Sequence, residues 1–286
     1  MPKQTIYLTS AADLSVRQNQ LSITLNDTGK TYFRSFEDLR MIIIDHHSVH
    51  LTVPLMNMFA KNNIGVVFCD EHHNPTTMLM DLDSNSVQTK HFRAQLEAEK
   101  TLAKQIWKQI VERKIQNQSK LLSKLGIGDD ILKPYYMNVK SGDVSNREGI
   151  AAKIYWRNLF GNHFVRDRFG PCPNDFLNYG YALLRSAVAR AIMDAGLLPT
   201  VGVFHRNYYN SFPLADDLME PYRPFVDERV FVQYVENKRV VDQDFKRRMM
   251  ELFYETITQD ELSATAHSLS RLFEKEGRLM YYPEMK

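Results

Sequence analysis

The stretch DFLNYGYALLRSAVARAIMDA, residues 175–195, decides the fold class, because its apolar residues recur with the period of an α-helix. Gly196 and Pro199 follow this stretch and end the helix. One stripe of the helix carries five apolar residues: Leu177, Tyr181, Leu184, Val188 and Ile192. The same period recurs between residues 92 and 110, in a segment without proline or glycine before Gly126. The chain after residue 82 is therefore predicted to form helices joined by short loops.

The first 80 residues carry a different pattern, of short alternating or β-branched runs. QLSITLN (20–26) alternates, and MIIID (41–45) and IGVVFC (64–69) are β-branched runs of strand length. One short helix is predicted between Val53 and Lys61. The predicted fold class is α+β, in three parts: a small N-terminal β-rich domain (1–82), a linker (83–90) and a larger all-α domain (91–286).

Composition excludes several classes of protein. The chain has 286 residues, 44% of them hydrophobic, and its 36 basic and 34 acidic side chains nearly balance, unlike a disordered chain. Cys69 and Cys172 are too few for a disulfide scaffold or a four-cysteine zinc site. The sequence has no apolar run of the roughly 18 residues that cross a bilayer, and its start, MPKQTIYLTS, lacks the layout of a secretory signal. We therefore expect a cytoplasmic protein without a membrane partner.

The middle of the chain is basic. Residues 90–168 carry 16 basic and 8 acidic side chains, a net charge of +8. Such a region suits a protein that holds a polyanion, and the alternative is a solvated helical face. Lys100, Lys104 and Lys108 are four apart and share one helix face. The candidate polyanion-binding residues, which the family resemblance described below makes DNA-binding candidates, are Lys100, Lys104, Lys108, Arg113, Lys114, Arg147, Lys153, Arg157, Arg166 and Arg168.

Asp45-His46-His47 follows an apolar strand and is the first candidate metal site. These three residues resemble the signature of the DHH phosphoesterases, which bind manganese. The Asp-x-Asp segment that this family has after its first strand is absent. Two interpretations stay open: a manganese phosphodiesterase with these ligands, or histidines on the surface of a turn.

SNREGIAAKIYW, residues 145–156, is predicted to begin a helix. Ser145 and Glu148 have the spacing of a capping box, in which each side chain binds a backbone amide of the first turn. Behind Glu148, small and aromatic residues pack the helix. The carboxylate of Glu148 is thus expected at the mouth of that helix, either as a cap or as a ligand.

GVFHRNYYNSFPLADDLMEPYRPF, residues 202–225, contains an imidazole and an acidic pair. His205 ends an apolar segment, and Pro213 can open a helix. Glu220 lies three residues after Asp217 and four after Asp216, so either aspartate can share its face. Two carboxylates and one imidazole suit Mg²⁺ or Mn²⁺, and the alternative is a structural role.

Three further expectations concern other residues of the segment 202–225. Pro221 and Pro224 are expected to tighten or kink the helix. Tyr208 and Tyr209 are expected to fill a core rather than stack on a base. Arg223 is open to pairing with Glu220 or with a phosphate.

Three motifs together, EGIAAKIYW, LNYGYALLRSAVARAIMDAGLLPTVGVFH and PLADDLMEPYRP, strongly resemble the CRISPR-associated integrase of spacer acquisition, the first and most widespread of the Cas proteins. The resemblance covers roughly residues 140–235, in order. The wording NYGY and ADDLMEP is most similar to the branch found with type II systems.

The resemblance implies a role for individual residues. Glu148, His205 and Glu220 match the family's ligands for one divalent ion, Mg²⁺ or Mn²⁺, and Asp217 matches an auxiliary acidic position. The family's β domain builds a homodimer, and its helical domain carries the catalytic site. The implied partners are spacer and repeat DNA, a small second Cas protein that bridges two dimers, and other type II Cas proteins.

The reaction that the resemblance implies is phosphoryl transfer between DNA strands. A 3′-hydroxyl attacks a phosphodiester at the border of a CRISPR repeat, and reversal or nuclease activity can use the same site. Alanine at Glu148, His205 or Glu220 is expected to abolish strand transfer and, if anything, to help folding. No glycine-rich phosphate loop is present, which agrees with a reaction without a nucleotide cofactor. The competing hypotheses are the DHH phosphodiesterase and a non-catalytic DNA-binding scaffold.

Overall fold

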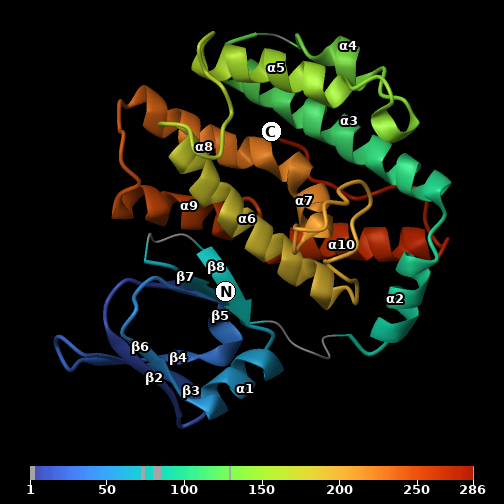
Figure 1. Cartoon of the computed structure of the whole chain (residues 1–286). Coiled ribbons are helices and arrows are strands. Elements are labelled where there is room, and N and C mark those ends of the chain that lie inside the picture. Colours follow the sequence, from blue (N-terminus) through green and yellow to red (C-terminus); the bar gives the residue numbers. More distant parts are fainter. Residues whose placement is uncertain (1–3, 72–74, 80–84, 129, 286) are drawn as a thin grey trace. The chain divides into compact units, whose positions relative to one another are not determined.

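The computed structural model describes residues 4–71, 75–79, 85–128 and 130–285. The chain divides into two compact units, Met1–Leu82 and Asp83–Lys286. Figure 1 shows strands concentrated in the first unit and helices in the second. This agrees with the α+β class predicted from the sequence.

Within its described residues, the first unit contains two four-stranded sheets. The first sheet has the order β1-β5-β7-β8, with β5 parallel to both β1 and β7 and with β8 antiparallel to β7. The second sheet has the order β4-β3-β2-β6. The strand bounds are β1 Gln4–Leu8, β2 Ala12–Arg17, β3 Gln20–Leu25, β4 Thr31–Ser35, β5 Leu39–Ile44, β6 Val49–Leu51, β7 Gly65–Cys69 and β8 Pro75–Leu79.

The core of the first unit is formed by the inward faces of the strands and by one helix, α1 (Val53–Lys61). Leu55 and Phe59 of α1 are fully buried. The ring of Phe59 meets that of Phe36 edge to face, with centroids 6.2 Å apart. Phe36 begins the short 3₁₀ turn η1 (Phe36–Asp38).

All the regular secondary structure that the structure describes in the second unit is helical. Its helices are α2 Gln88–Leu96, α3 Lys100–Lys124, α4 Lys133–Tyr136, α5 Arg147–Phe160, α6 Asn174–Asp194, α7 Pro213–Met219, α8 Arg223–Val235, α9 Gln243–Glu255 and α10 Gln259–Phe273. Two 3₁₀ turns, η2 Ser141–Asp143 and η3 Glu220–Tyr222, lie between them. Among the described residues, no helix is both long and apolar enough to cross a membrane.

Helix α6 coincides within one residue with the stretch 175–195 and is the central element of the second unit. Most of its side chains are buried, and it packs against α7, α8 and α10. Gly180 permits the close approach of α8, because a Cβ at this position would lie 2.5 Å from Cγ1 of Val226. Helix α3 packs against α5, α7, α8 and η3 and so reaches every segment that carries the candidate site.

Two boundaries differ from the expectations. Helix α2 begins at Gln88, so residues 88–90 of the predicted linker are helical. The periodic segment before Gly126 forms two helices, α2 and α3, which are separated by residues 97–99. Neither glycine nor proline occurs at this break, and nothing in the local sequence explains it.

Candidate active site

Glu148 lies in the first turn of α5, and the predicted capping box there is wrong. The N-cap is Asn146, whose Oδ1 accepts a hydrogen bond from the amide of Gly149 at 3.2 Å. The carboxylate of Asp143 accepts from the amides of Arg147 at 2.8 Å and Glu148 at 3.0 Å. The buried Ser145 hydroxyl has no hydrogen-bond partner. Because Asp143 and Asn146 satisfy the helix amides, the carboxylate of Glu148 is left for another role.

His205 is held by Asp217 of α7. Nδ1 of His205 lies 2.6 Å from Oδ1 of Asp217, so it donates to the carboxylate and the other ring nitrogen, Nε2, is left for a ligand. The same carboxylate accepts from the backbone amides of Val203, Phe204 and His205 at 2.6, 2.9 and 3.2 Å. Asp217 is fully buried and thus supports the histidine instead of facing the site beside Glu220.

The bend before His205 depends on a residue without a side chain. A Cβ at Gly202 would lie 2.4 Å from the carbonyl oxygen of His205 and 3.0 Å from the carboxylate of Asp217. Only glycine therefore lets the chain fold back so tightly that the carboxylate of Asp217 accepts hydrogen bonds from three consecutive amides.

Charge around His205 favours its protonated form. The hydrogen bond with Asp217 raises the pKa of His205, and the nearby charge of Glu220 adds to that effect against the opposing effect of burial. Burial also raises the pKa of Asp217, although its hydrogen bonds oppose the rise. The hydrogen bond itself raises the pKa of His205 and lowers that of Asp217, as expected when the imidazole carries the proton and the carboxylate accepts it.

Glu220 begins η3, directly before Pro221, and its side chain is buried. Pro221 lies in this 3₁₀ turn, whereas Pro224 lies in the first turn of α8. Nζ of Lys114 lies 2.5 Å from Oε2 of Glu220, and the guanidinium of Arg223 lies 3.1 Å from Oε1. Burial alone would raise the pKa of Glu220, but Arg223 and Lys114 lower it overall. Arg223 was open to pairing with Glu220 or with a phosphate, and in this structure it pairs with Glu220.

Lys114 is a buried residue of the site, although its charge and position predict contact with DNA. Its side chain is only 9% exposed and binds both Glu148 and Glu220, each at 2.5 Å. Burial alone would lower the pKa of Lys114, but the two carboxylates raise it. A signal existed, because Lys114 lies on the buried stripe that runs through Trp107, Val111, Gln118 and Leu121 of α3.

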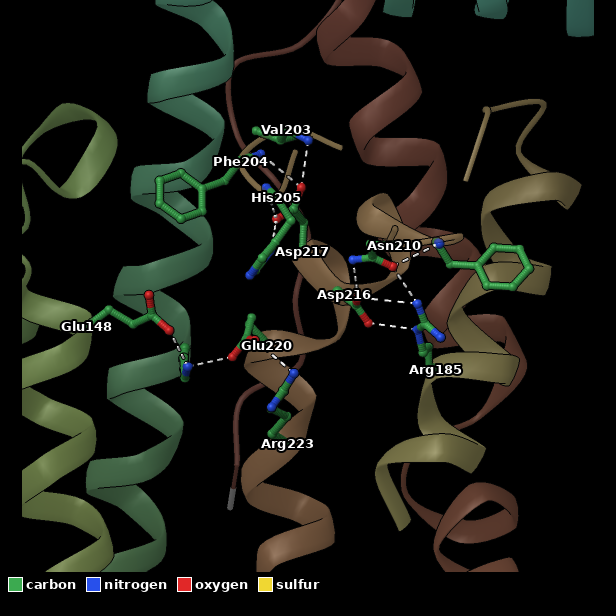
Figure 2. Close-up of polar contacts among 12 residues, drawn as sticks. Glu148, Arg185, Val203, Phe204, His205, Asn210, Asp216, Asp217, Glu220 and Arg223 are labelled. Atoms are coloured by element: carbon green, nitrogen blue, oxygen red, sulfur yellow. Dashed lines mark hydrogen bonds and ion pairs between the residues drawn. The ribbon is translucent and has the colours of Figure 1, made fainter. Parts of the chain in front are cut away.

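The three candidate ligands share one region of the second unit. Figure 2 shows the imidazole of His205, held by Asp217 of α7, on the side of the site that faces Glu148 and Glu220. Among the described residues, no three His, Cys, Asp or Glu side chains lie close enough to hold a metal ion. The ammonium of Lys114 lies between the carboxylates of Glu148 and Glu220, 2.5 Å from each.

The chemistry of the donor set nevertheless fits a divalent ion. Two carboxylates and an imidazole with a free Nε2 are the ligands that Mg²⁺ and Mn²⁺ accept. The buried Oε2 of Glu220 has Lys114 as its partner, at 2.5 Å. Oxygens of two carboxylates therefore surround a position that already holds a positive charge.

The removal of Glu220 should not help folding, contrary to the expectation from sequence. Its carboxylate is the counter-ion of the buried Lys114 and Arg223. A variant without it leaves two cations partly unpaired, which is destabilising in a buried site. Glu148, whose side chain is 26% exposed, is a less critical counter-ion.

Asp216 faces away from Glu220. Its carboxylate binds the guanidinium of Arg185 at 2.8 Å and the amide of Asn210 at 2.7 Å. Arg185 also donates to Asn210 at 2.6 Å. These contacts, drawn in Figure 2, fasten the loop after His205 to α6.

The loop after His205 presents two tyrosines to solvent. Tyr208 and Tyr209 are fully exposed, so the expectation that they fill a core is wrong. Asn207 makes a turn here, because its carbonyl and side chain accept from the amides of Asn210 and Tyr209. Beside the loop opens a hollow of about 740 Å³, lined in part by His205, Arg206 and Tyr208.

The DNA-binding candidates differ in how far they are free to meet phosphates. Lys100, Lys104, Lys153 and Arg168 are exposed. Arg166 instead donates to Asn174 at 3.0 Å and Asn178 at 2.7 Å within its own loop. The others have these neighbours: Lys108 with Glu112, Arg113 with Glu284, Arg147 with the ring of Tyr135, and Arg157 with Asn162.

A buried cluster connects α5, α6 and α8. The hydroxyls of Tyr155 and Tyr181 donate to the carboxylate of Asp227 at 2.7 and 2.5 Å. Burial raises the pKa of Asp227 to about 7, although the two tyrosines oppose the rise. The guanidinium of Arg223 lies over the ring of Tyr181, 4.7 Å from its centre, and so links this cluster to Glu220.

Asp45-His46-His47 has its own local contacts in the first unit. The hydroxyl of Tyr7 donates to the buried Asp45 carboxylate, and Nδ1 of His46 accepts from the amide of Ser48 at 3.1 Å. The rings of His46 and His47 are stacked, with centroids 4.6 Å apart. No group of three potential ligands close enough to hold a metal includes these residues within the described chain.

Comparison with known proteins gives the same family as the motifs. Residues 6–265 match the family described as "CRISPR associated protein Cas1". A CRISPR-associated endonuclease Cas1 from Neisseria meningitidis serogroup C (strain 8013) is 35% identical over 240 residues, covering 83% of this chain and 78% of that protein. A Cas1 from Francisella tularensis subsp. novicida (strain U112) is 26% identical over 261 residues, covering 83% of this chain and 81% of that protein.

Solved structures share the fold. A casposase bound to its integration product aligns with a TM-score of 0.81 at 24% identity and covers all of this chain and 95% of the casposase. The Cas1 protein TM1797 from Thermotoga maritima aligns with a TM-score of 0.74 at 18% identity, covering 98% of this chain and all of that protein. With the family match over nine-tenths of its length, the chain belongs to the CRISPR-associated Cas1 family.

Proposed function

We propose that this chain is a metal-dependent DNA integrase that inserts new spacer DNA into a CRISPR array. The 3′-hydroxyl of the incoming strand attacks a phosphodiester at the repeat border, and the same site can reverse the reaction or cleave DNA. One observation carries the proposal: in a Cas1 family member, Glu148 and Glu220 meet around one positive charge, and His205 points toward them.

Glu148, Glu220 and Nε2 of His205 would hold the divalent ion, Mg²⁺ or Mn²⁺. When bound, the ion supplies neutralisation of the charge that builds up on the non-bridging phosphate oxygens. The protein's own contribution is positional. Asp217 fixes the ring of His205 through Nδ1, and the amides that bind Asp217 fix that carboxylate in turn.

The buried cations have a second role in this proposal. Lys114 and Arg223 balance the charge of Glu148 and Glu220, so the acidic pair can remain ionised although Glu220 is buried. Phosphate contacts come from exposed basic side chains, of which Lys100, Lys104 and Lys153 are the best placed to meet solvent. Such contacts are largely blind to base sequence.

The partners are proposed from the family and from its solved relatives. Related chains have been solved in a Cas6-RT-Cas1–Cas2 complex and in a Cas1–DNA complex. We infer that this chain forms a homodimer through its N-terminal unit and that a small second Cas protein bridges two dimers. The 35% identical relative comes from an organism with a type II system, which supports the type II branch and its further Cas proteins as partners.

Integration into a supercoiled plasmid that carries a repeat array tests the proposal. Glu148→Gln, His205→Ala and Glu220→Gln should each remove strand transfer in Mg²⁺ or Mn²⁺, while His47→Ala should retain it. DNA binding by the folded variants should persist. Loss of activity in His47→Ala with full activity in His205→Ala would instead favour the DHH phosphodiesterase. DNA binding without strand transfer by the unmodified protein would favour a scaffold.

A further inference from the structure

Lys114 occupies the place where the proposed function puts a metal ion. Its ammonium lies 2.5 Å from Oε1 of Glu148 and 2.5 Å from Oε2 of Glu220. It comes from the middle of α3, whereas the two carboxylates come from α5 and η3. One positive charge therefore joins three elements at the position where the two acidic side chains converge.

The contact between Lys114 and Glu220 is as short as the contact between Lys114 and Glu148. Nζ of Lys114 lies 2.5 Å from Oε2 of Glu220 and 2.5 Å from Oε1 of Glu148. The charge of Lys114 and its hydrogen bond both lower the pKa of the buried Glu220 carboxyl. Displacement of the ammonium would therefore free one oxygen of each carboxylate for another cation.

The charges around Glu148 and Glu220 are already balanced, so a divalent ion and the ammonium of Lys114 cannot bind there together. Glu148 and Glu220 carry two negative charges, and Lys114 and Arg223 balance them with two positive charges. A divalent ion would add two further charges at the same spot, where the local dielectric constant is low and repulsion between cations is strong. Arg223 binds the other oxygen of Glu220 and can stay in place, but Lys114 cannot.

Resting on the proposed function, we propose that Lys114 is a built-in substitute for the metal: it holds Glu148 and Glu220 together in the metal-free protein, and the divalent ion binds by displacing its ammonium. Loading of the site is then an exchange of one cation for another. The affinity for the ion is lower than the donor set alone would give, because each binding event must break at least one of the two ion pairs of Lys114.

Mn²⁺ binding to the purified full-length protein, measured by calorimetry without DNA, tests this exchange. Lys114→Met keeps the length of the side chain and removes the competing charge, so we expect it to bind Mn²⁺ at least about tenfold more tightly than the unmodified protein. Lys114→Arg keeps a competing cation and should show no such gain. The matched control is Arg223→Met, which removes one charge from Glu220 without contacting Glu148 and should tighten binding less than Lys114→Met.

Two results overturn the inference. One is a Lys114→Met protein that binds Mn²⁺ no more tightly than the unmodified protein, and the other is an equal gain in Arg223→Met, which would indicate a general charge effect. Failure of the proposed function looks different, because Glu220→Gln would then bind Mn²⁺ as the unmodified protein does, or none of the proteins would bind it.

A second measurement does not depend on the folding of a variant. In a crystal structure of the unmodified protein soaked in Mn²⁺, we expect Nζ of Lys114 to lie more than about 4 Å from at least one of the two carboxylates, beyond ion-pair distance. An ion bound to Glu148 and Glu220 with Lys114 still bridging both would disprove the exchange.

Discussion

Oδ1 of Asp217 lies 2.6 Å from Nδ1 of His205, and the same carboxylate accepts hydrogen bonds from three consecutive backbone amides. The imidazole is thus oriented by a side chain that is itself fixed by the backbone. Carboxylate–histidine pairs of this kind set which ring nitrogen is available to a metal. The relationship explains how an acidic residue beside Glu220 can matter without being a ligand.

The first prediction concerns this pair. Asp217→Asn should lower strand transfer by about 10- to 100-fold, because the amide orients the ring poorly. His205 must be neutral to bind a metal, and Asp217 raises its pKa. The acid limb of the rate–pH profile should therefore move to lower pH in the variant. Asp216→Asn is the matched control, since Asp216 contacts Arg185 and Asn210 instead. An unchanged acid limb in Asp217→Asn would contradict the assignment.

The second prediction concerns the first turn of α5. Asp143→Ala removes the acceptor for the amides of Arg147 and Glu148 and should cost about 1–2 kcal/mol of unfolding free energy. Strand transfer should fall as well, because the backbone that carries Glu148 loses its anchor. Ser145→Ala should change stability by less than about 0.5 kcal/mol, because its hydroxyl has no partner. Urea unfolding measures both changes. A loss of unfolding free energy above about 0.5 kcal/mol in Ser145→Ala would instead support a capping box of Ser145 and Glu148.

The third prediction separates DNA contacts from structural arginines. Lys100→Ala combined with Lys104→Ala should weaken DNA binding at low salt and make its salt dependence shallower by up to about 2 in log–log slope. Arg166→Ala should instead lower thermal stability, because Arg166 joins Asn174 and Asn178, and should leave the DNA affinity of the folded protein unchanged. Filter binding and thermal melting measure the two effects. The reverse pattern would indicate that Arg166, and not Lys100 and Lys104, contacts the DNA.

The fourth prediction concerns pH and the buried Asp227. Its pKa is raised to about 7 in the folded state, whereas an unfolded aspartate titrates near 4. Between these values the folded protein holds a proton that the unfolded chain has released, so this stabilisation is complete below about pH 4 and is lost as the pH rises through about 7. Relative to Asp227→Asn, the unfolding free energy should fall by a few kcal/mol across this range, at about 1.4 kcal/mol for each pKa unit. Parallel curves for the two proteins would show that Asp227 does not titrate there.

Local sequence patterns predicted most of the architecture. The β-branched runs 41–45 and 64–69 correspond to β5 and β7, and the stretch 175–195 corresponds to α6. These patterns are informative because side chains repeat with different periods in strands and in helices. Each element shows its period in its own residues, without any contact to another element. The break between α2 and α3 carries no such signal, because the apolar period continues across it.

The candidate site was only partly accessible from sequence. The motifs gave Glu148, His205 and Glu220 with Asp217 as an auxiliary residue, and Arg223 was open to pairing with Glu220. They did not give Lys114 or Asp143. The pairing of Lys114 with two carboxylates depends on how α3 packs against α5 and η3, which sequence spacing does not encode. The same holds for Asp143, which replaces the predicted Ser145 cap from a preceding turn.

The most direct test of the whole account is the position of a bound ion. Anomalous diffraction from crystals soaked in Mn²⁺ should give one strong peak in each chain, with oxygens of Glu148 and Glu220 and Nε2 of His205 within about 2.0–2.4 Å of it. A peak beside Asp45, His46 and His47, or no peak at Glu148 and Glu220 in crystals whose protein is active in solution, would contradict it.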